Sequence, residues 1–523
     1  MRQQTSRREF GMAAAAAVAV TLVAAAGCSS TGSSGNPDSS STGTPKQGGT
    51  LRVGLVGGSV KDSLDAGTPI THPDEARVIA LYDTLTTYDT QHKLQMALAD
   101  KITPSENGKL WTVQLRNGLK FSDGSPITAA DVVFTFQRIT DPKAPLAGAT
   151  AFTTLDRNGL MATGDRTVSF PFKEPYATFP DTIAQYGNGI VPKGFNPKQP
   201  VGSGPFKFQS FTPGQESTFV KNPYYWRTGQ PYLDKLVIID FPDDNARVNA
   251  LLSGQVDAID QLPLSQINIV KANPQLKVLE SQTGSWQPFT MRVDQPPFND
   301  VRVRQAFRLM VDRQQMVTQV LNGHGTVGND MYAPLDECYP KDIPQRTQNI
   351  AEAKKLLAAA GQSNLTVTLD TSPVAAGVVE AAQVFAQQAK AAGVTINVRK
   401  VDPGTFYGDN YLKWTFAQDF YFTRDYLPQA ALLGFPTSPY NETHWNDAEW
   451  QQVVTKANAT LDEAARCKLV AQAEKIDYDR GAYIVWGFSN NLDAYSSSVV
   501  GFLPDTSGIP LTSYGFRGVW LNK

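Results

Sequence analysis

Residues 48–523 alternate between short stretches with the polarity pattern of strands and stretches with apolar residues at helical spacing. Thr50–Leu55 and Leu110–Arg116 both read as half-buried strands. Strands that alternate with helices along a chain favour α/β lobes. A chain of 523 residues is also too long for one hydrophobic core of ordinary size. We therefore expect an α/β protein with two or three lobes.

The same patterns predict further elements along this body. Further strands are expected at Val237–Phe241, Val256–Ile259, Leu365–Leu369 and Val394–Val401, and after a turn within Val201–Phe208. Helices are expected at Arg77–Leu85, after the capping residue Thr128, and at Asn245–Leu252, Ala351–Ala360, Val378–Ala392, Asp447–Ala459 and Glu463–Tyr478. Caps are expected from Asn446 for the helix near Asp447 and from Asp300 for one long helix that carries Val303, Phe307, Met310, Val311 and Met316.

The N-terminal segment has the order of an export signal. Ser6–Phe10 contains an arginine pair and resembles a twin-arginine signal, which carries proteins across a membrane already folded. An uncharged run rich in Ala and Val extends over Met12–Ala26 and is too short for a membrane-spanning helix, which needs ~20 apolar residues. We expect residues 1–27 to be removed on export. The alternative is a retained signal anchor.

A lone cysteine follows this run. Ala25–Cys28 resembles a bacterial lipobox, with Ala where Leu is usual, so we expect a lipid anchor on Cys28. Residues 28–47 are nearly all small or polar and are expected to form a flexible tether. In an oxidising compartment outside the cytoplasm, Cys338 and Cys467 have the opportunity to form a disulfide.

The charge balance excludes one class of partner. The formal net charge is −2, and residues 1–27 hold three Arg and one Glu, so the exported chain is slightly more acidic. Such a balance gives no basic surface for nucleic acid. Hydrophobic residues make up 41% of the chain and charged residues 18%, which is typical of a globular protein.

Five segments of the body together resemble a known signature. They occur in the order Trp111–Phe134, Val201–Phe208, Lys221–Trp226, Leu251–Asp257 and Pro297–Ala306. Their sequences are similar to those of family 5 extracellular solute-binding proteins, the peptide- and nickel-binding components of ABC importers. The resemblance covers essentially all of residues 48–523.

The resemblance implies a two-lobed α/β fold of the periplasmic-binding-protein type (type II, large cluster C) with a hinge and a small inserted subdomain. The implied boundaries are lobe I over 48–85, 199–292 and 484–523, the inserted subdomain over 86–198, and lobe II over 293–483. It also implies a monomer, with no cofactor and no enzymatic activity, that captures a di- or oligopeptide in the cleft and delivers it to an ABC permease and its ATPase.

A peptide ligand needs a carboxylate for its ammonium group, a cation for its carboxylate, and aromatic walls. Phe422–Tyr426 supplies Arg424, Asp425 and Tyr426 together, and it resembles the family segment in which an Asp pairs with a peptide α-amino group. The alternative for Arg424 and Asp425 is a solvated surface pair. Aromatic candidates for the ligand-binding walls are Trp414, Trp486, Trp445 and Trp286. The alternative for each Trp is a place in the core.

Other functions remain open at this point. Within the family, an oligosaccharide or a nickel chelate is an alternative ligand, with His444 as one possible contact. A receptor that only senses its ligand would share the fold. A secreted hydrolase is disfavoured because the chain has no Gly-x-Ser-x-Gly or His-Glu-x-x-His motif, so no catalytic or metal residue is assigned. The four histidines, His72, His92, His324 and His444, are scattered, and Gly323–Gly328 is expected to be a loop.

Overall fold

The computed structural model describes residues 43–69, 71–438 and 440–522. The predicted export signal and the predicted site of a lipid anchor, Cys28, lie outside these residues, as does most of the predicted tether. No helix of the described chain is both long and apolar enough to cross a membrane.

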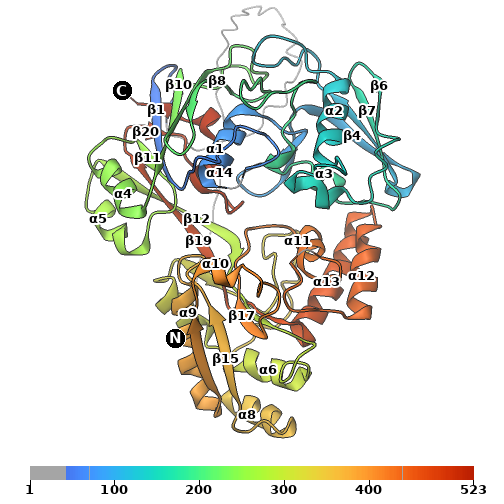
Figure 1. The fold of residues 1–523 in the computed structure, drawn as a ribbon, viewed down its shortest axis with the longest axis vertical. Coiled ribbons are helices and arrows are strands. Elements are labelled where there is room, and N and C mark those ends of the chain that lie inside the picture. The colour runs from blue at the N-terminus through green and yellow to red at the C-terminus, as the bar shows by residue number, and fades with distance from the viewer. Residues whose placement is uncertain (1–42, 70, 439, 523) are drawn as a thin grey trace, which may run out of the picture. The chain divides into compact units, whose positions relative to one another are not determined.

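An eight-stranded mixed sheet forms the centre of the upper group of elements in Figure 1. Its main path is β12-β19-β11-β1-β10-β9-β8, and β14 pairs with β19. The strands are β1 (Thr50–Val56), β8 (Phe206–Thr212), β9 (Glu216–Lys221), β10 (Lys235–Phe241), β11 (Ala258–Ile259), β12 (Leu276–Trp286), β14 (Gly325–Val327) and β19 (Gly487–Ser496). β1 runs parallel to β10 and β11, and the other pairs are antiparallel.

Helices cover this sheet and close its core. They are α1 (His72–Leu81), α4 (Asp244–Leu252), α5 (Ile267–Lys271) and α14 (Pro510–Tyr514). The predicted helix at Arg77–Leu85 therefore begins and ends earlier than expected. Thr71 caps α1 and Pro73 lies in its first turn, which favours the earlier start, while Tyr82 is already extended. A two-stranded pair, β20 (Val499–Val500) and β21 (Trp520–Leu521), lies beside the sheet core.

A smaller antiparallel sheet with the order β4-β5-β7-β6 packs around its own core. Its elements are β4 (Ala99–Ser105), β5 (Leu110–Leu115), β6 (Met161–Gly164), β7 (Thr167–Pro171), α2 (Ala129–Ile139) and α3 (Phe179–Thr182). A hairpin of β2 (Thr86–Tyr88) and β3 (Leu94–Met96) precedes it. As predicted, Thr128 begins α2, and it forms a capping box with Asp131.

The lower group in Figure 1 contains a three-stranded sheet and a parallel pair of strands. The strands are β13 (Phe289–Met291), β17 (Phe416–Gln418) and β18 (Tyr483–Ile484), with β15 (Thr366–Thr371) paired to β16 (Thr395–Lys400). The helices are α6 (Val301–Met310), α7 (Arg313–Val320), α8 (Ile350–Ala359), α9 (Val378–Ala389), α10 (Pro403–Phe406), α11 (Tyr426–Leu433), α12 (Ala448–Asn458) and α13 (Glu463–Arg480).

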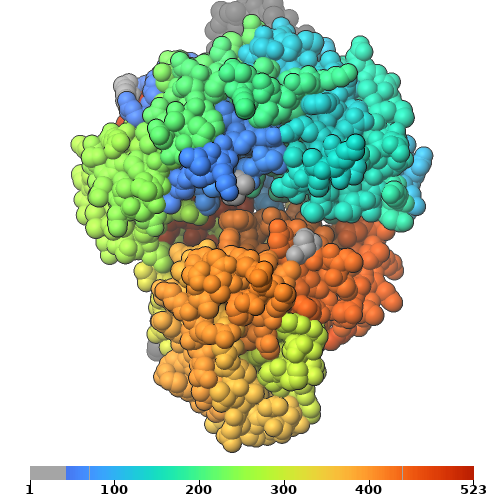
Figure 2. All heavy atoms as spheres, viewed as in Figure 1, coloured from blue at the N-terminus to red at the C-terminus, as the bar shows by residue number. Residues whose placement is uncertain are grey.

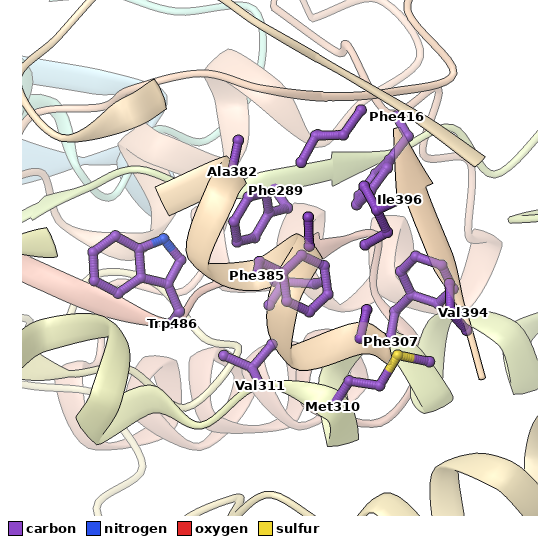
Figure 3. Packing of buried hydrophobic residues seen from close by; sticks show 14 of the residues in the cluster. Phe289, Phe307, Met310, Val311, Ala382, Phe385, Val394, Ile396, Phe416 and Trp486 are labelled. Atoms are coloured by element: carbon purple, nitrogen blue, oxygen red, sulfur yellow. The ribbon is translucent and has the colours of Figure 1, made fainter. Parts of the chain in front are cut away.

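Two hydrophobic cores hold this group together. One surrounds Phe289, Phe307, Phe385 and Phe416, with Trp486 beside them (Figure 3). The other lies around α11, α12 and α13. A disulfide joins Cys338 to Cys467 of α13, with 4.5 Å between their Cα atoms, and so ties the loop before α8 to the second core.

Three local predictions need correction. The long helix predicted after Asp300 is two helices, because Val311 is extended and the Asp312 side chain caps α7 by accepting the N–H of Gln315. The cap of α12 is Asp447 instead of Asn446. The expected loop at Gly323–Gly328 contains β14, which gains backbone partners along β19.

The chain passes between the two groups through neighbouring strands. β12 ends at Trp286 and leads into β13, while β18 leads through Trp486 into β19. β12 and β19 pair along most of their length, from Leu276 opposite Ser496 to Trp286 opposite Phe488. The strands lie between the upper and lower groups in Figure 1.

Candidate ligand-binding site

The segment Phe422–Tyr426 is held by contacts from other parts of the chain. Thr423 Oγ1 accepts the N–H of Gly284 at 2.9 Å. Asp336 Oδ2 accepts the N–H of Tyr426, the first residue of α11, at 2.8 Å. Asp425 occupies the N-cap position, but its side chain makes no capping hydrogen bond. Because Asp336 serves the helix N-terminus, the Asp425 carboxylate is available for other contacts.

Asp425 contacts the tip of the β2–β3 hairpin, more than 300 positions away in the sequence. Its Oδ1 lies 3.1 Å from His92 Nε2, and its Oδ2 accepts the Tyr88 hydroxyl at 3.3 Å. The Tyr88 and His92 rings stack with centroids 4.3 Å apart. Figure 2 shows the surface indented where blue and teal residues of the first 200 positions face orange residues of the lower group.

The hairpin tip is shaped by a turn that presents the imidazole. The Asp89 carboxylate accepts the N–H groups of Gln91 and Lys93, which tightens the turn. His92 has a φ of 61°, in the left-handed region. The imidazole side chain is only 8% exposed, against 21% for the Asp425 carboxylate. The contact is therefore largely removed from water.

Three further carboxyl groups lie around this contact. The Tyr88 hydroxyl also donates to Asp181 Oδ1 at 3.0 Å. Burial, and then the charge of Asp425, raise the pKa of Asp181 to about 6 and the pKa of Asp336 to about 6. Burial likewise raises the pKa of Asp505. The region around Asp425 thus concentrates negative charge.

This negative charge acts on His92. Burial alone would lower the pKa of the imidazole, but the hydrogen bond and charge of Asp425, with the charges of Asp505 and Asp336, outweigh it and raise the pKa. The site therefore favours a cation beside Asp425. In the structure the imidazole of His92 lies at this position, with its Nε2 against Asp425 Oδ1.

Arg424 differs from its neighbour in having no hydrogen bond or ion pair with any residue of the described chain. Its side chain is half-buried, and burial lowers the pKa of the guanidinium. The ionisable groups close enough to influence its pKa are Tyr186, Tyr440, Tyr421 and Glu75. Glu75 itself accepts the Tyr186 hydroxyl at 2.8 Å. Arg424 thus faces α1 and the segment after α3 with spare donors.

The two charges belong to consecutive residues but face different neighbours. Asp425 is extended, with φ −68° and ψ 159°. Successive side chains of an extended backbone point to opposite sides. The segment therefore presents a carboxylate toward the hairpin and a guanidinium toward Tyr186 and Glu75. An elongated molecule with a cationic and an anionic end matches this arrangement.

The other predicted contacts lie in packed cores. Tyr426 is fully buried, and its hydroxyl donates to Asp477 at 2.6 Å and accepts from Trp450 at 2.8 Å. Trp486 belongs to the phenylalanine core (Figure 3). Trp286 stacks on Tyr332 and Tyr421.

The remaining two tryptophans are also engaged by the protein. Trp445 is buried, and Trp414 is half-buried, stacks on Phe406 and donates to its carbonyl. The Asp425 side chain makes its hydrogen bonds with Tyr88 and His92 and with none of the four tryptophans. Their roles as ligand walls stay predictions.

Sequence reasoning missed the hairpin partners and two aromatic side chains. Phe422 and Tyr440 are 38% and 44% exposed. Phe422 lies two residues before Arg424 in the sequence, and Tyr440 is close enough to influence the pKa of Arg424. Only the exposure of these rings distinguishes them from core residues, and sequence does not reveal exposure. No local pattern marks Tyr88 or His92.

His444, the possible nickel contact, is engaged by the protein itself. His444 lies 3.0 Å from Asp294 and 2.9 Å from the Leu412 carbonyl. The described residues contain no group of three or more His, Cys, Asp or Glu side chains arranged to hold a metal.

Gly508, with φ 84°, packs against the segment of the candidate site, since a Cβ there would lie 2.8 Å from both Thr423 Oγ1 and Ser285 Oγ.

The fold and sequence place this chain in a known class. The model of the bacterial extracellular solute-binding proteins, family 5, middle region, matches residues 93–424. The chain belongs to this family and is an extracytoplasmic solute-binding protein with the α/β fold of type II periplasmic binding proteins, as the sequence predicted.

Three relatives show the range of this likeness. The oligopeptide-binding protein AppA of Bacillus subtilis is 31% identical over 68% of this chain and 67% of its own length. Its structure with a nonapeptide aligns with a TM-score of 0.74 at 25% identity, covering 92% and 100% of the two chains. The glutathione-binding protein GsiB of Pectobacterium atrosepticum is 26% identical over 86% and 91%. NikZ of Campylobacter jejuni, solved with Ni(L-His), has a TM-score of 0.77 at 19% identity over 90% and 99%.

Proposed function

We propose that this protein captures a peptide with free termini, holding the ammonium group at Asp425 and the carboxylate at Arg424. The observation that carries the proposal is the half-buried guanidinium of Arg424, which has no ion pair in the described chain and sits next to a carboxylate facing the other way. A charge enclosed without a partner is costly, so a ligand that supplies the partner gains affinity.

The relatives support a peptide more than the alternatives. AppA is named for oligopeptides and GsiB for glutathione, itself a peptide, and both align over two thirds or more of their length. NikZ, at 19% identity, supports the fold alone. The acidic surroundings of Asp425 favour the cationic end of the ligand, and the exposed rings of Phe422 and Tyr440 provide apolar surface near Arg424.

We propose the lobe boundaries predicted from the sequence: 48–85, 199–292 and 484–523 for lobe I, 86–198 for the inserted subdomain and 293–483 for lobe II. The large sheet and the two neighbouring strand crossings support this division, with exceptions at its edges. β14 of lobe II pairs with β19 of lobe I, and β13 and Trp486, assigned to lobe I, pack in the phenylalanine core of lobe II. Ligand contact with both lobes would shift the protein toward the closed state.

The proposed setting is outside the cytoplasmic membrane. The chain would be exported by its N-terminal signal, anchored through a lipid on Cys28, and would act as a monomer without enzymatic activity. It would deliver its ligand to an ABC permease and the attached ATPase. The sequence features of residues 1–47 and membership of the family support this setting.

Calorimetry with tri-alanine tests the proposal. We expect micromolar binding of the free peptide, and a loss of at least tenfold on N-acetylation or on Asp425→Asn, because each removes one charge of a desolvated pair. Asp479→Asn, which changes an exposed ion pair with Lys475, is the control. Equal affinity for free and N-acetylated peptide would contradict the assignment of Asp425.

Native mass spectrometry of the purified exported chain tests the ligand class independently. A bound mass that fits a short peptide supports the proposal. A mass that fits hexose units or a nickel complex would instead support the corresponding alternative ligand and contradict the peptide assignment.

A further inference from the structure

Both oxygens of the Asp425 carboxylate are engaged by the chain itself. Oδ1 meets the imidazole of His92, and Oδ2 accepts the hydroxyl of Tyr88. The position assigned to the ligand's ammonium group is therefore occupied in the structure by the imidazole of His92. An incoming ammonium group has to replace at least one of these contacts.

His92 and Asp425 come from two regions of the chain that pack around separate cores. Leu85 and Leu98, which flank the hairpin, belong to the core of the smaller sheet. Tyr426 and Leu427, which follow Asp425, belong to the core around α12 and α13. The His92–Asp425 contact therefore joins two cores, and it can break without unpacking either of them.

We propose that His92 is a specificity-determining residue that competes with the ligand's ammonium group for Asp425. This inference rests on the function proposed above, since it takes Asp425 as the group that binds the ligand's cationic end. Ligands with a strong cationic group displace the imidazole, whereas ligands without one leave it in place and gain no contact with Asp425.

A second feature shows that the imidazole is an imperfect partner. His92 Nδ1 is buried and has no hydrogen-bond partner in the described chain. A buried polar atom without a partner destabilises the contact that buries it. An ammonium group, with three donors that rotate freely, satisfies a carboxylate without leaving such an atom. A ligand without a cationic group therefore cannot replace His92 at Asp425, whereas a ligand with an ammonium group can.

The charges around His92 couple this exchange to protons. The hairpin presents Tyr88, α11 presents Asp425, the loop before Cys338 presents Asp336, and the segment before α14 presents Asp505. Asp181 of α3 reaches the cluster through Tyr88. A displaced His92 leaves these carboxylates and returns toward its ordinary pKa. It then releases its proton as the ammonium group arrives.

The variant His92→Asn tests this role. Asn adopts the left-handed conformation that φ 61° requires, but its side chain is too short to keep the contact with Asp425. We expect tri-alanine to bind about tenfold more tightly to this variant, as expected for the loss of a competing charge-assisted hydrogen bond. N-acetylated tri-alanine should bind both proteins alike.

The matched control is His324→Gln. His324 forms a pair of the same kind with Glu280 at 2.9 Å, between the loop before β14 and β12. This variant should bind tri-alanine as the wild type does. Melting curves of each variant show whether it is folded.

Proton release gives a second readout. Calorimetry at pH 6.5 in buffers of different ionisation enthalpy should show that His92→Asn releases fewer protons on binding than the wild type. Unchanged affinity with unchanged proton release would overturn the role of His92 while leaving the peptide proposal intact. Failure of both proteins to bind any free peptide would overturn both. Binding by the variant alone would support the competition directly.

Discussion

Two buried guanidinium groups in this protein have opposite surroundings. Arg77 of α1 has no exposed side-chain surface and contacts Asp62, Asp74 and Asp240 within 3.2 Å, with Ser217 as a further partner. Arg424 is half-buried and has no hydrogen bond or ion pair within the described chain. The first arginine is satisfied by the fold, and the second is not.

The difference separates stability from binding. A guanidinium whose donors are all used cannot accept a ligand without losing the contacts that hold it. A guanidinium that the fold leaves unsatisfied carries a desolvation cost that a ligand carboxylate can offset. Burial of charge therefore does not by itself mark a functional residue. A buried charge without a partner, beside a second charge that faces another way, makes Arg424 a candidate for ligand binding.

The largest effect is expected from Arg77→Met. This change removes the cation shared by three buried carboxylates at nearly constant volume. We expect the free energy of unfolding, measured by urea denaturation, to fall by about 3 to 5 kcal/mol. Tri-alanine binding by the folded fraction should be preserved. A loss below about 1 kcal/mol would mean that Arg77 and Arg424 do not differ in the way described.

A smaller effect, on affinity alone, is expected from Arg424→Gln. The free energy of unfolding should change by less than about 1 kcal/mol, because no protein contact is lost. Affinity for tri-alanine should fall by at least about thirtyfold, the cost of truncating one side of a desolvated pair. Tri-alanine amide, which lacks the carboxylate, should bind both proteins equally. A matching loss with the amide would contradict contact between Arg424 and the peptide carboxylate.

The smallest effect concerns pH. Asp181 and Asp336 have pKa values of about 6 in the folded protein, above the ordinary value, so the folded state binds more protons than the unfolded state between about pH 4 and 6. Their contribution to stability is largest at acidic pH and is lost as pH rises through 6. His92, whose pKa is also raised, acts in the same direction.

We expect the free energy of unfolding to fall by about 1.3 kcal/mol for each of these two carboxyls between pH 5 and 7. The double variant Asp181→Asn/Asp336→Asn should flatten that slope, as measured by urea denaturation at several pH values. A variant in the Arg77 region, Asp74→Asn, provides a comparison outside the cluster. An unchanged slope in the double variant would show that the carboxyls near Asp425 are not the cause.

Local features of the fold were predictable where one short stretch contains the whole signal. Thr128 and Asp131 lie three residues apart and form their capping box as expected. The break between α6 and α7 was missed, because Asp312 sits within an unbroken apolar pattern. Such a pattern does not reveal that an internal Asp will cap a second helix.

The candidate site was predictable only in part, for a similar reason. Arg424 and Asp425 share one segment, so chemistry and resemblance pointed to both. His92 and Tyr88 reach Asp425 only through tertiary packing, and no periodicity encodes that approach. Tryptophan was chosen for its ring, yet two of the four candidates, Trp286 and Trp486, are among the most buried large side chains. Amino-acid type does not distinguish a core ring from a wall.

Gly508 lies at a point where two segments of the chain approach each other too closely for a side chain. Any side chain at this position would be wedged between Ser285, where β12 leaves the large sheet, and Thr423, which anchors the charged segment. Alanine there would also strain a backbone held at φ 84°. A single added methyl group would thus push Ser285 and Thr423 apart. Solution scattering would show whether the variant is more open than the native protein.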